Sequence, residues 1–140
     1  DGIRLHGKAR LAVVGRGRAP AGDRIHFLGE QEEMKPIFGM AEVLLHPTFY
    51  DPCSLVVLEA LGCGVPVITT RYNGAAELME GTEAGKVLDE PNDPEGMASA
   101  LEELLDPAAY GGFQENAARL GTQCGFIEHV NRMEAWLMGS

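Results

Sequence analysis

Residues 51–70 of this chain read DPCSLVVLEALGCGVPVITT and contain its clearest structural signal. Ser54 directly precedes an apolar run, which is typical of the start of a helix. Gly62 lies at the end of that run, and the β-rich segment Val65–Thr70 that follows predicts the next strand. The stretch therefore predicts a helix over 54–61 followed by a strand.

One carboxylate, Glu59, lies inside the apolar run. A helix that is apolar on nearly all sides is a buried helix, and an ionised Glu there is costly unless another group pairs with it. Natural sequences break a local rule of this kind mostly at functional sites. We therefore expect Glu59 to belong to a functional site on a buried helix.

The 140 residues predict one domain, 1–140, that is long enough to bury a sizeable core. The balance of 45% hydrophobic to 23% charged residues is ordinary for a globular protein. No apolar run approaches the ~20 residues of a membrane span, and no signal peptide is visible. The chain begins at Asp1 rather than Met, so we interpret it as a piece of a longer protein.

The net charge of −10 argues against binding to duplex nucleic acid, because neutralisation of phosphates supplies most of that affinity. Six of the eleven Lys and Arg residues fall among the first 24 positions, which fits either a small anionic ligand or a solvated face. Cys53, Cys63 and Cys124 have no metal-ligand spacing, and no Asp-x-Asp or His/Cys cluster is present. We therefore expect free thiols in a reducing, cytoplasmic compartment and no catalytic metal.

Short apolar runs alternate with helical patterns along most of the chain. This alternation predicts an α/β fold with a Rossmann-like parallel sheet that is covered by helices on both faces. The predicted strands are 11–15, 24–29, 41–46, 65–70 and 85–88, and the predicted helices are 32–40, 54–61, 73–79, 94–105 and one or two within 110–137. The connection 16–23 is shorter than a usual parallel crossover. Either it is an irregular loop, or a natural helix is missing from this chain.

In doubly wound sheets, ligands bind outside the carboxyl ends of the strands, where three loops are predicted here. These loops are 15–22, 47–54 and 71–74. The segment Gly15-Arg16-Gly17-Arg18 partly matches a dinucleotide fingerprint, but Pro20 stands where the third Gly belongs. As a motif for NAD it is very weak. A Gly-rich turn beside a ligand and a plain strand exit are equally compatible with it.

The start of the helix after the loop 47–54 is a stronger candidate for a site. Its first N–H groups, at Ser54, Leu55 and Val56, form with the helix dipole an anion site that needs no basic side chain. Asp51 lies just outside this helix and Glu59 roughly 7–8 Å inside it, at ~1.5 Å per residue. A sugar nucleotide with its phosphate at the helix start could place hydroxyl groups against both carboxylates. The residues alone leave this open against a structural role, with Asp51 in a turn and Glu59 bonded to buried backbone.

The block 46–79, HPTFYDPCSLVVLEALGCGVPVITTRYNGAAELM, resembles the donor-site signature of the retaining GT-B glycosyltransferases of family 4, also called group 1. That signature is an acidic residue, seven others and a Glu, followed by Ala and then by Gly, Pro and Val. Asp51 and Glu59 have this spacing, and the later signature residues follow in place. The order of the segments on both sides also matches, so the resemblance covers roughly 11–105.

The resemblance implies the C-terminal, donor-binding half of a GT-B fold. It implies that Glu59 holds the ribose hydroxyls of a nucleotide-diphosphate sugar and that Asp51 holds hydroxyls of the transferred sugar. The other residues that it places against the donor are Gly15, Gly17 and Arg18 beside the base, the amides of Cys53, Ser54 and Leu55 at the diphosphate, and Gly74 beside the sugar. Enzymes of this kind retain the anomeric configuration and use no metal in the active site.

The resemblance also implies an N-terminal acceptor domain in the same parent chain. We therefore expect the isolated domain to be inactive, and the parent protein to be cytoplasmic, with peripheral attachment at the inner face of the membrane as an option. The acceptor itself is not predicted. The strand that carries the phosphate-binding Arg and Lys of the family would lie before the first residue of this chain.

The chain departs from the family pattern at two places. Asp51 stands where Glu is usual, and Cys53-Ser54 stands where a Phe-Gly pair is common. Two other functions stay open: a sugar-nucleotide epimerase of GT-B type, and a non-catalytic Rossmann-like interaction module. The interaction module predicts that internal partners engage Glu59. His46, a lone His at the end of a predicted strand, we interpret as structural.

Overall fold

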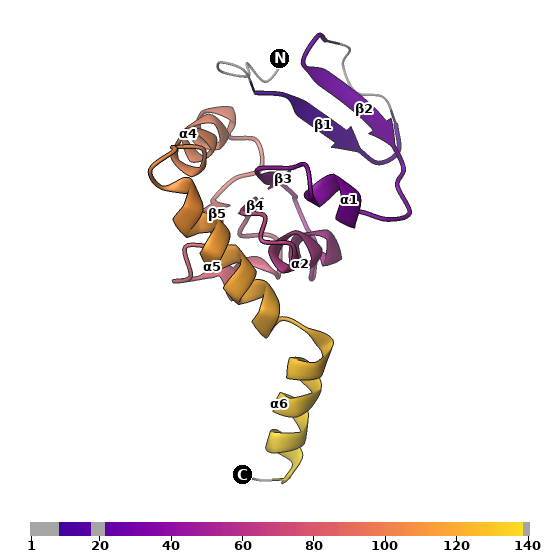
Figure 1. Ribbon diagram of the computed structural model, residues 1–140, viewed down its shortest axis with the longest axis vertical. Coiled ribbons are helices and arrows are strands. Elements are labelled where there is room, and N and C mark those ends of the chain that lie inside the picture. Colours follow the sequence, from indigo (N-terminus) through magenta and orange to yellow (C-terminus); the bar gives the residue numbers. More distant parts are fainter. Residues whose placement is uncertain (1–8, 18–21, 139–140) are drawn as a thin grey trace. The chain divides into compact units, whose positions relative to one another are not determined.

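The structure is a computed structural model that describes residues 9–17 and 22–138 (Figure 1). The chain divides into two compact units, residues 1–34 and residues 35–140, and each unit is described by itself. The single domain 1–140 stays a prediction.

The first unit contains two strands that pair in parallel. They are β1 (Leu11–Val14) and β2 (Ile25–Gly29). Just beyond the end of β1, the Gly15 N–H donates to the carbonyl of Gly29, the last residue of β2, at 2.9 Å. Of the connection between the strands, residues 15–17 and 22–24 are described, and they form bends and a turn without a helix. The described part of this connection is therefore an irregular loop, one of the two alternatives that its length left open.

The second unit is built on a three-stranded parallel sheet in the order β3-β4-β5. Its strands are β3 (Leu44–His46), β4 (Val67–Thr70) and β5 (Gly85–Leu88). Its helices are α1 (Lys35–Phe38), α2 (Leu55–Gly62), α3 (Ala76–Met79), α4 (Pro94–Leu104), α5 (Tyr110–Gln123) and α6 (Phe126–Met138). The predicted α/β class with parallel strands is confirmed.

Strand β4 is the centre of this sheet, and all of its residues are buried. Ile68 packs with Ala100 and Leu104 of α4 in an apolar cluster. Because successive side chains of a strand alternate between the two faces of a sheet, Val67 points to the opposite face, where α2 packs. Figure 1 shows α2 and α4 on either side of the sheet, so the prediction of helices on both faces is confirmed.

The bounds of α2 follow from its end residues. Ser54 precedes the first helical residue, and the turn after the helix is closed by Gly64 at φ 72°, a left-handed conformation that glycine adopts without strain. The helix predicted over 32–40 is shorter in the structure and covers only Lys35–Phe38. A helix that begins near residue 32 would need a backbone N–H at Pro36, and proline has none, which explains the later start.

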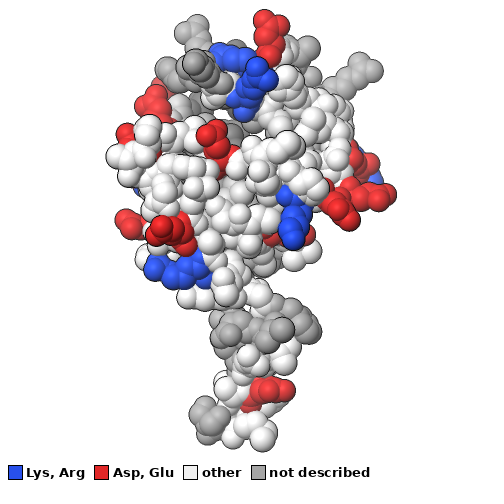
Figure 2. All heavy atoms as spheres, viewed as in Figure 1, with Lys and Arg blue, Asp and Glu red and all other residues white. Residues whose placement is uncertain are grey.

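The last helix, α6, exposes large apolar side chains, including Trp136, which is 82% exposed. Within residues 9–17 and 22–138, no helix combines the length and the apolar character that crossing a bilayer requires. On the face drawn in Figure 2, Lys and Arg side chains lie in small separate groups among acidic ones.

Candidate functional site

The carboxyl ends of β3 and β4 are joined by the two loops that follow them. The Asp51 N–H donates to the Tyr72 carbonyl at 3.1 Å, and the Gly74 N–H donates to the Asp51 carbonyl at 2.9 Å. Asp51 and Asn73 thereby form an isolated parallel bridge beyond the last paired residues of the strands. The loops that the sequence placed at the ligand-binding edge of the sheet, 47–54 and 71–74, thus lie against each other.

Gly74 permits this contact between the two loops. A Cβ atom at Gly74 would lie 1.9 Å from the carbonyl oxygen of Pro52 and 2.9 Å from its carbon. Contacts this short do not occur in folded proteins, so any side chain here would separate the loops. Glycine at this position is explained by the close approach of the backbones, whatever it borders in a complex.

Asn73 is the centre of a buried polar network. Its side chain is 1% exposed, and its Oδ1 accepts hydrogen bonds from the N–H of Ser54 at 3.3 Å and of Ala75 at 3.0 Å. Its Nδ2 donates to Thr69 Oγ1 at 3.1 Å, and Thr69 Oγ1 donates to the His46 carbonyl at 3.0 Å. The network therefore links the ends of β3 and β4 to the start of α2.

The sequence assigned Asn73 only to the start of a short helix. In the structure α3 begins at Ala76, the residue before it is Ala75, and no side chain caps it. One hydrogen bond of the Asn73 side chain reaches 19 positions back, to the Ser54 N–H. No local pattern reveals a partner that distant. The one available signal was a carboxamide next to a glycine directly after a buried strand.

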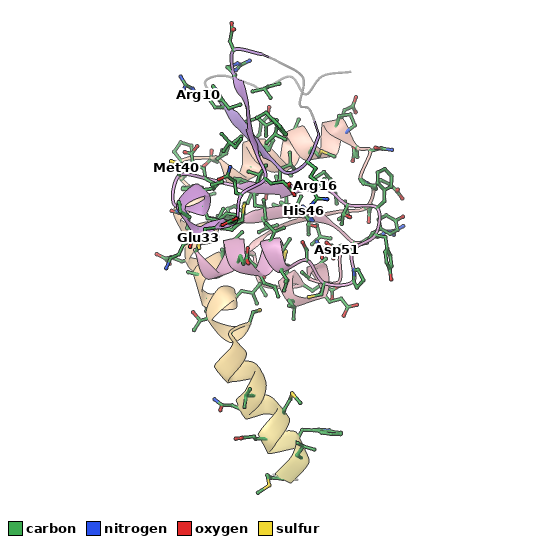
Figure 3. All side chains as sticks on the ribbon, turned by 90° about the vertical axis from the view of Figure 1, so that its right-hand side faces the viewer. Arg10, Arg16, Glu33, Met40, His46 and Asp51 are labelled. Carbon is green, nitrogen blue, oxygen red and sulfur yellow. The ribbon has the colours of Figure 1, made fainter. Side chains whose placement is uncertain are left out.

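The Asp51 side chain closes a turn within its loop and lies beside His46. Its Oδ1 accepts from the Cys53 N–H at 3.2 Å, and its Oδ2 lies 3.6 Å from His46 Nε2. The side chains of Asp51 and His46 are 28% and 32% exposed, so both reach the surface while most of each is covered. Figure 3 labels both residues, which lie close together beside the sheet.

The first turn of α2 has two backbone N–H groups without a partner in the part of the chain that the structure describes. The Ser54 N–H donates to Asn73 and the Cys53 N–H donates to Asp51. The N–H groups of Val57 and Leu58 both donate to the Ser54 carbonyl. The remaining N–H groups are those of Leu55 and Val56. Of the three amides that the resemblance places at a diphosphate, two are therefore engaged internally and one, Leu55, is open.

The expectation that α2 is buried on nearly all sides is wrong. Val57, Ala60 and Leu61 are buried, whereas Glu59 is exposed and Leu55 is 71% exposed. Residues four apart share one face of a helix, so Leu55 and Glu59 form an exposed stripe that runs from the open first turn. Glu59 is consequently not a buried charge, and the argument from its burial fails. Its carboxylate has no hydrogen bond or ion pair with any described residue.

Three other predicted site residues come from the N-terminal part of the chain. Gly15 and Gly17 belong to the first unit, where they follow β1 with φ values of 131° and 108°. Arg18 lies outside the described residues. No group of three or more His, Cys, Asp or Glu side chains within 9–17 and 22–138 is arranged to hold a metal ion.

Arg71 is a basic residue directly after β4, and its guanidinium lies beside two acidic side chains. It donates to the Tyr72 hydroxyl at 3.4 Å and lies 3.7 Å from Glu90 and 3.9 Å from Asp89. The bond to Tyr72, with a smaller contribution from the two carboxylates, raises the pKa of Arg71 above its usual value. All of these groups are exposed, so their pairing is worth little to stability.

Comparison with known proteins identifies relatives for most of the chain. The family model described as "Glycosyl transferases group 1" matches residues 3–107. Lipopolysaccharide glucosyltransferase WaaG of Escherichia coli K12 is 31% identical over 81 residues, which are 58% of this chain and 22% of that protein. N-acetyl-alpha-D-glucosaminyl L-malate synthase of Bacillus anthracis is 36% identical over 83 residues, 59% of this chain and 22% of that protein. The chain thus spans about a fifth of the length of these curated relatives.

Solved structures have the same fold. The crystal structure of WaaG superimposes with a TM-score of 0.70 at 25% identity over 81% of this chain and 34% of its own. Sucrose-phosphate synthase of Thermosynechococcus elongatus superimposes with a TM-score of 0.68 at 26% identity over 84% of this chain and 31% of its own. The predicted Rossmann-like half of a GT-B fold is confirmed by these neighbours. Because the family model covers residues 3–107, three quarters of the sequence, this chain belongs to the group 1 glycosyltransferases.

Proposed function

We propose that this chain is the donor-binding domain of a retaining glycosyltransferase, which transfers a sugar from a nucleotide-diphosphate sugar to an acceptor. The observation that carries the proposal is the open first turn of α2. Along the chain, the open N–H groups of Leu55 and Val56 lie between two carboxylates. Asp51 precedes the helix, and Glu59 shares the exposed helix face with Leu55. A nucleotide-diphosphate sugar offers sugar hydroxyls, a diphosphate and ribose hydroxyls in the matching order.

In this proposal, the diphosphate binds at the first turn of α2. The open N–H groups and the helix dipole stabilise the negative charge that develops on the leaving diphosphate as the bond to the sugar breaks. This stabilisation comes from the backbone, so the proposed reaction uses no metal. The N–H groups of Cys53 and Ser54 can bind the diphosphate only if their hydrogen bonds to Asp51 and Asn73 are replaced by hydrogen bonds to phosphate oxygens.

The two carboxylates bind hydroxyl groups on either side of the diphosphate. Asp51 accepts hydrogen bonds from the transferred sugar through Oδ2, because Oδ1 is already bonded to the Cys53 N–H. Glu59, about 6 Å further along the helix axis than Leu55, accepts from the ribose. Gly74 lies beside the sugar in this proposal. Its lack of a side chain lets its loop lie against the loop of Asp51. That Gly15, Gly17 and Arg18 border the base stays a prediction from the family resemblance.

The exposure of the Glu59 carboxylate favours this function over an interaction module. A module in which Glu59 had only a structural role would engage its carboxylate internally. In the described parts of the chain the carboxylate is exposed and has no such partner. A carboxylate on the face that leads from an anion-binding turn is available to a ligand.

The complete reaction needs more than this chain in our proposal. The curated relatives are about five times longer than the matched part, so a second domain of the parent protein has room to bind the acceptor. The donor base is not assigned by the described residues. Anabaena HepE, which has been solved in complex with UDP-glucose, has the same fold with a TM-score of 0.69 at 22% identity over 84% of this chain and 32% of its own. UDP-glucose is therefore a reasonable first ligand, and a cytoplasmic parent protein would have access to it.

The test is calorimetric titration of the chain with UDP-, GDP- and ADP-glucose and with GDP-mannose, each beside its free nucleoside diphosphate. We expect saturable binding to the nucleotides of one base, and its loss in Glu59→Ala. Glu115→Ala, an exposed glutamate in the middle of α5, is the matched control and should bind as the parent chain does. Equal affinities of the two variants would contradict the proposed role of Glu59. If no nucleotide binds, the same panel with the full-length parent decides whether the donor site needs a second domain.

A further inference from the structure

Ser54 occupies the position of a helix cap without capping the helix. Serine is favoured immediately before the first helical residue because its hydroxyl can accept a hydrogen bond from the second or third N–H of the helix. In the structure the Ser54 side chain makes no such bond. Its Oγ lies instead 3.2 Å from His46 Nε2, at hydrogen-bond distance.

His46 is held firmly enough to direct that hydroxyl. It is the last residue of β3, paired in register with Thr69 of the buried β4, and its carbonyl accepts from Thr69 Oγ1 at 3.0 Å. Its side chain is about two thirds covered. The groups at its Nε2 are Ser54 Oγ at 3.2 Å and Asp51 Oδ2 at 3.6 Å. The tautomer of His46 decides which partner donates, but either tautomer keeps the Ser54 hydroxyl on the histidine.

We propose that His46 is a positioning residue for the donor site, which holds the Ser54 hydroxyl away from the first turn of α2 and so keeps the N–H groups of that turn open for the diphosphate. This inference rests on the proposed function. It adds a residue that the sequence had assigned to structure alone. Without His46 the hydroxyl is free to rotate onto the open N–H of Val56, the second residue of the helix, and the helix caps itself. A ligand must then displace that bond before it can bind.

The first experiment measures the free protein, without ligand. Amide hydrogen exchange of Leu55, Val56 and Val57 is followed by NMR in the parent chain, in His46→Leu and in the double variant His46→Leu with Ser54→Ala. A capping bond worth about 1 kcal/mol corresponds to about fivefold slower exchange at the N–H that it protects. We expect that slowing in His46→Leu and its reversal in the double variant, which has no hydroxyl. Unchanged exchange in His46→Leu, or equal slowing in both variants, overturns the inference.

The second experiment measures binding as a double-mutant cycle, with UDP, GDP and ADP as probes. We expect His46→Leu to weaken binding of the nucleoside diphosphate about fivefold when Ser54 is present, and less than about twofold when residue 54 is Ala. A histidine that merely supported the fold would weaken binding by the same factor in both backgrounds. That result would overturn the inference.

Two further variants separate the role of the hydrogen bond from that of the ring. His46→Gln offers a side-chain amide to Ser54 and should restore fast exchange and tight binding. His46→Ala repeats the comparison with a smaller side chain if Leu is poorly tolerated in β3. Failure of the proposed function is recognised separately: the parent chain would then bind no nucleoside diphosphate, while the exchange experiment would still decide what His46 does to Ser54.

Discussion

Helices α2 and α4 both follow a strand of the same parallel sheet, yet their first turns are completed differently. At α4 the Asp93 carboxylate accepts from the Gly96 N–H at 2.8 Å, and Pro94 removes one N–H from the turn. At α2 the residue in the equivalent position, Ser54, bonds no helix N–H with its side chain. A cap contributes about 1 kcal/mol, so the α2 start lacks stabilisation that the α4 start has. A closed helix start serves the fold, whereas an open one beside two surface carboxylates is available to an anion.

The largest effect should come from separating the two loops that frame the α2 start. In Gly74→Ala the new Cβ would meet the Pro52 carbonyl, so we expect a loss of about 3 kcal/mol in the free energy of unfolding, with loss of nucleotide binding. Urea unfolding measures the first quantity. Gly112→Ala is the control, because a Cβ there meets nothing and alanine favours a helix by about 0.5–1 kcal/mol. Similar stabilities of the two variants would show that the loops can separate without cost.

Removal of the Glu59 carboxylate should affect binding alone. Hydrogen bonds to a charged group are worth about 1.5–3 kcal/mol, so Glu59→Ala should weaken nucleotide binding about ten- to a hundredfold. Its exposed position predicts an unfolding free energy within about 0.5 kcal/mol of the parent chain. Calorimetric titration and urea unfolding of the same samples check both values. A large loss of stability would mean that the carboxylate has a structural partner.

The α4 start should respond in the opposite way. Asp93→Ala removes the bond to the Gly96 N–H and should lower the free energy of unfolding by about 1 kcal/mol. Nucleotide affinity should stay the same, because α4 covers the other face of the sheet. Thermal unfolding measures the change in stability, and calorimetric titration measures the nucleotide affinity. A drop in affinity as large as that in Glu59→Ala would place α4 in the binding site and remove the contrast between the two helices.

Asp51 should act on the sugar more than on the nucleotide. Asp51→Asn keeps an oxygen for the Cys53 N–H but removes the charge of the carboxylate. We expect about fivefold weaker binding of the nucleotide sugar, from the loss of one charge-assisted hydrogen bond, and little change for the free nucleoside diphosphate. Titration with UDP-glucose and UDP, or with the matching pair of another base, gives the ratio. An equal loss for both ligands contradicts a role in holding the sugar.

The sequence predicted both helix starts, but it did not predict the difference between them. Local signals predicted both helices, α2 from Ser54 and the apolar run after it and α4 from helical apolar spacing over 94–105, and β5 was predicted with its observed bounds, Gly85–Leu88. Whether a cap residue makes its bond depends on what lies beside it in space. For Ser54 that neighbour is His46, eight positions back on another element. The family spacing of Asp51 and Glu59 predicted a site at this place in the chain, but it did not reveal which hydrogen bonds its polar groups make.

The exposure of Glu59 escaped prediction for a related reason. An almost wholly apolar helix has no pattern that tells its covered face from its open one. The stripe along Leu55 and Glu59 is exposed because α5 and the sheet pack against α2 and leave Val57, Ala60 and Leu61 buried, and only the packing decides which side is covered. The buried network of Asn73 was hidden in the same way, since its bonds join residues of separate loops.

A third helix start, that of α5, offers the smallest effect and a test by pH. Here Asp106 Oδ1 accepts from the N–H groups of Ala108 and Ala109, and the Tyr110 hydroxyl donates to the Glu42 carbonyl at 3.2 Å. Burial, with a smaller contribution from the Glu42 charge, raises the pKa of Tyr110 above its ordinary value near 10. The folded state thus holds this proton more tightly than the unfolded state does.

The sign of the pH dependence follows from that direction. The contribution of Tyr110 to stability is fully present below pH ~10 and is lost as the pH rises through the higher value of the folded state. Urea unfolding at several values between pH 8 and 11 should therefore show a steeper fall for the parent chain than for Tyr110→Phe, which has no proton to lose. Tyr50→Phe is the same substitution at a tyrosine that is 80% exposed, and the slopes of the two variants are compared. If the Tyr110→Phe slope equals that of the parent chain, the stability of the start of α5 does not depend on the Tyr110 proton.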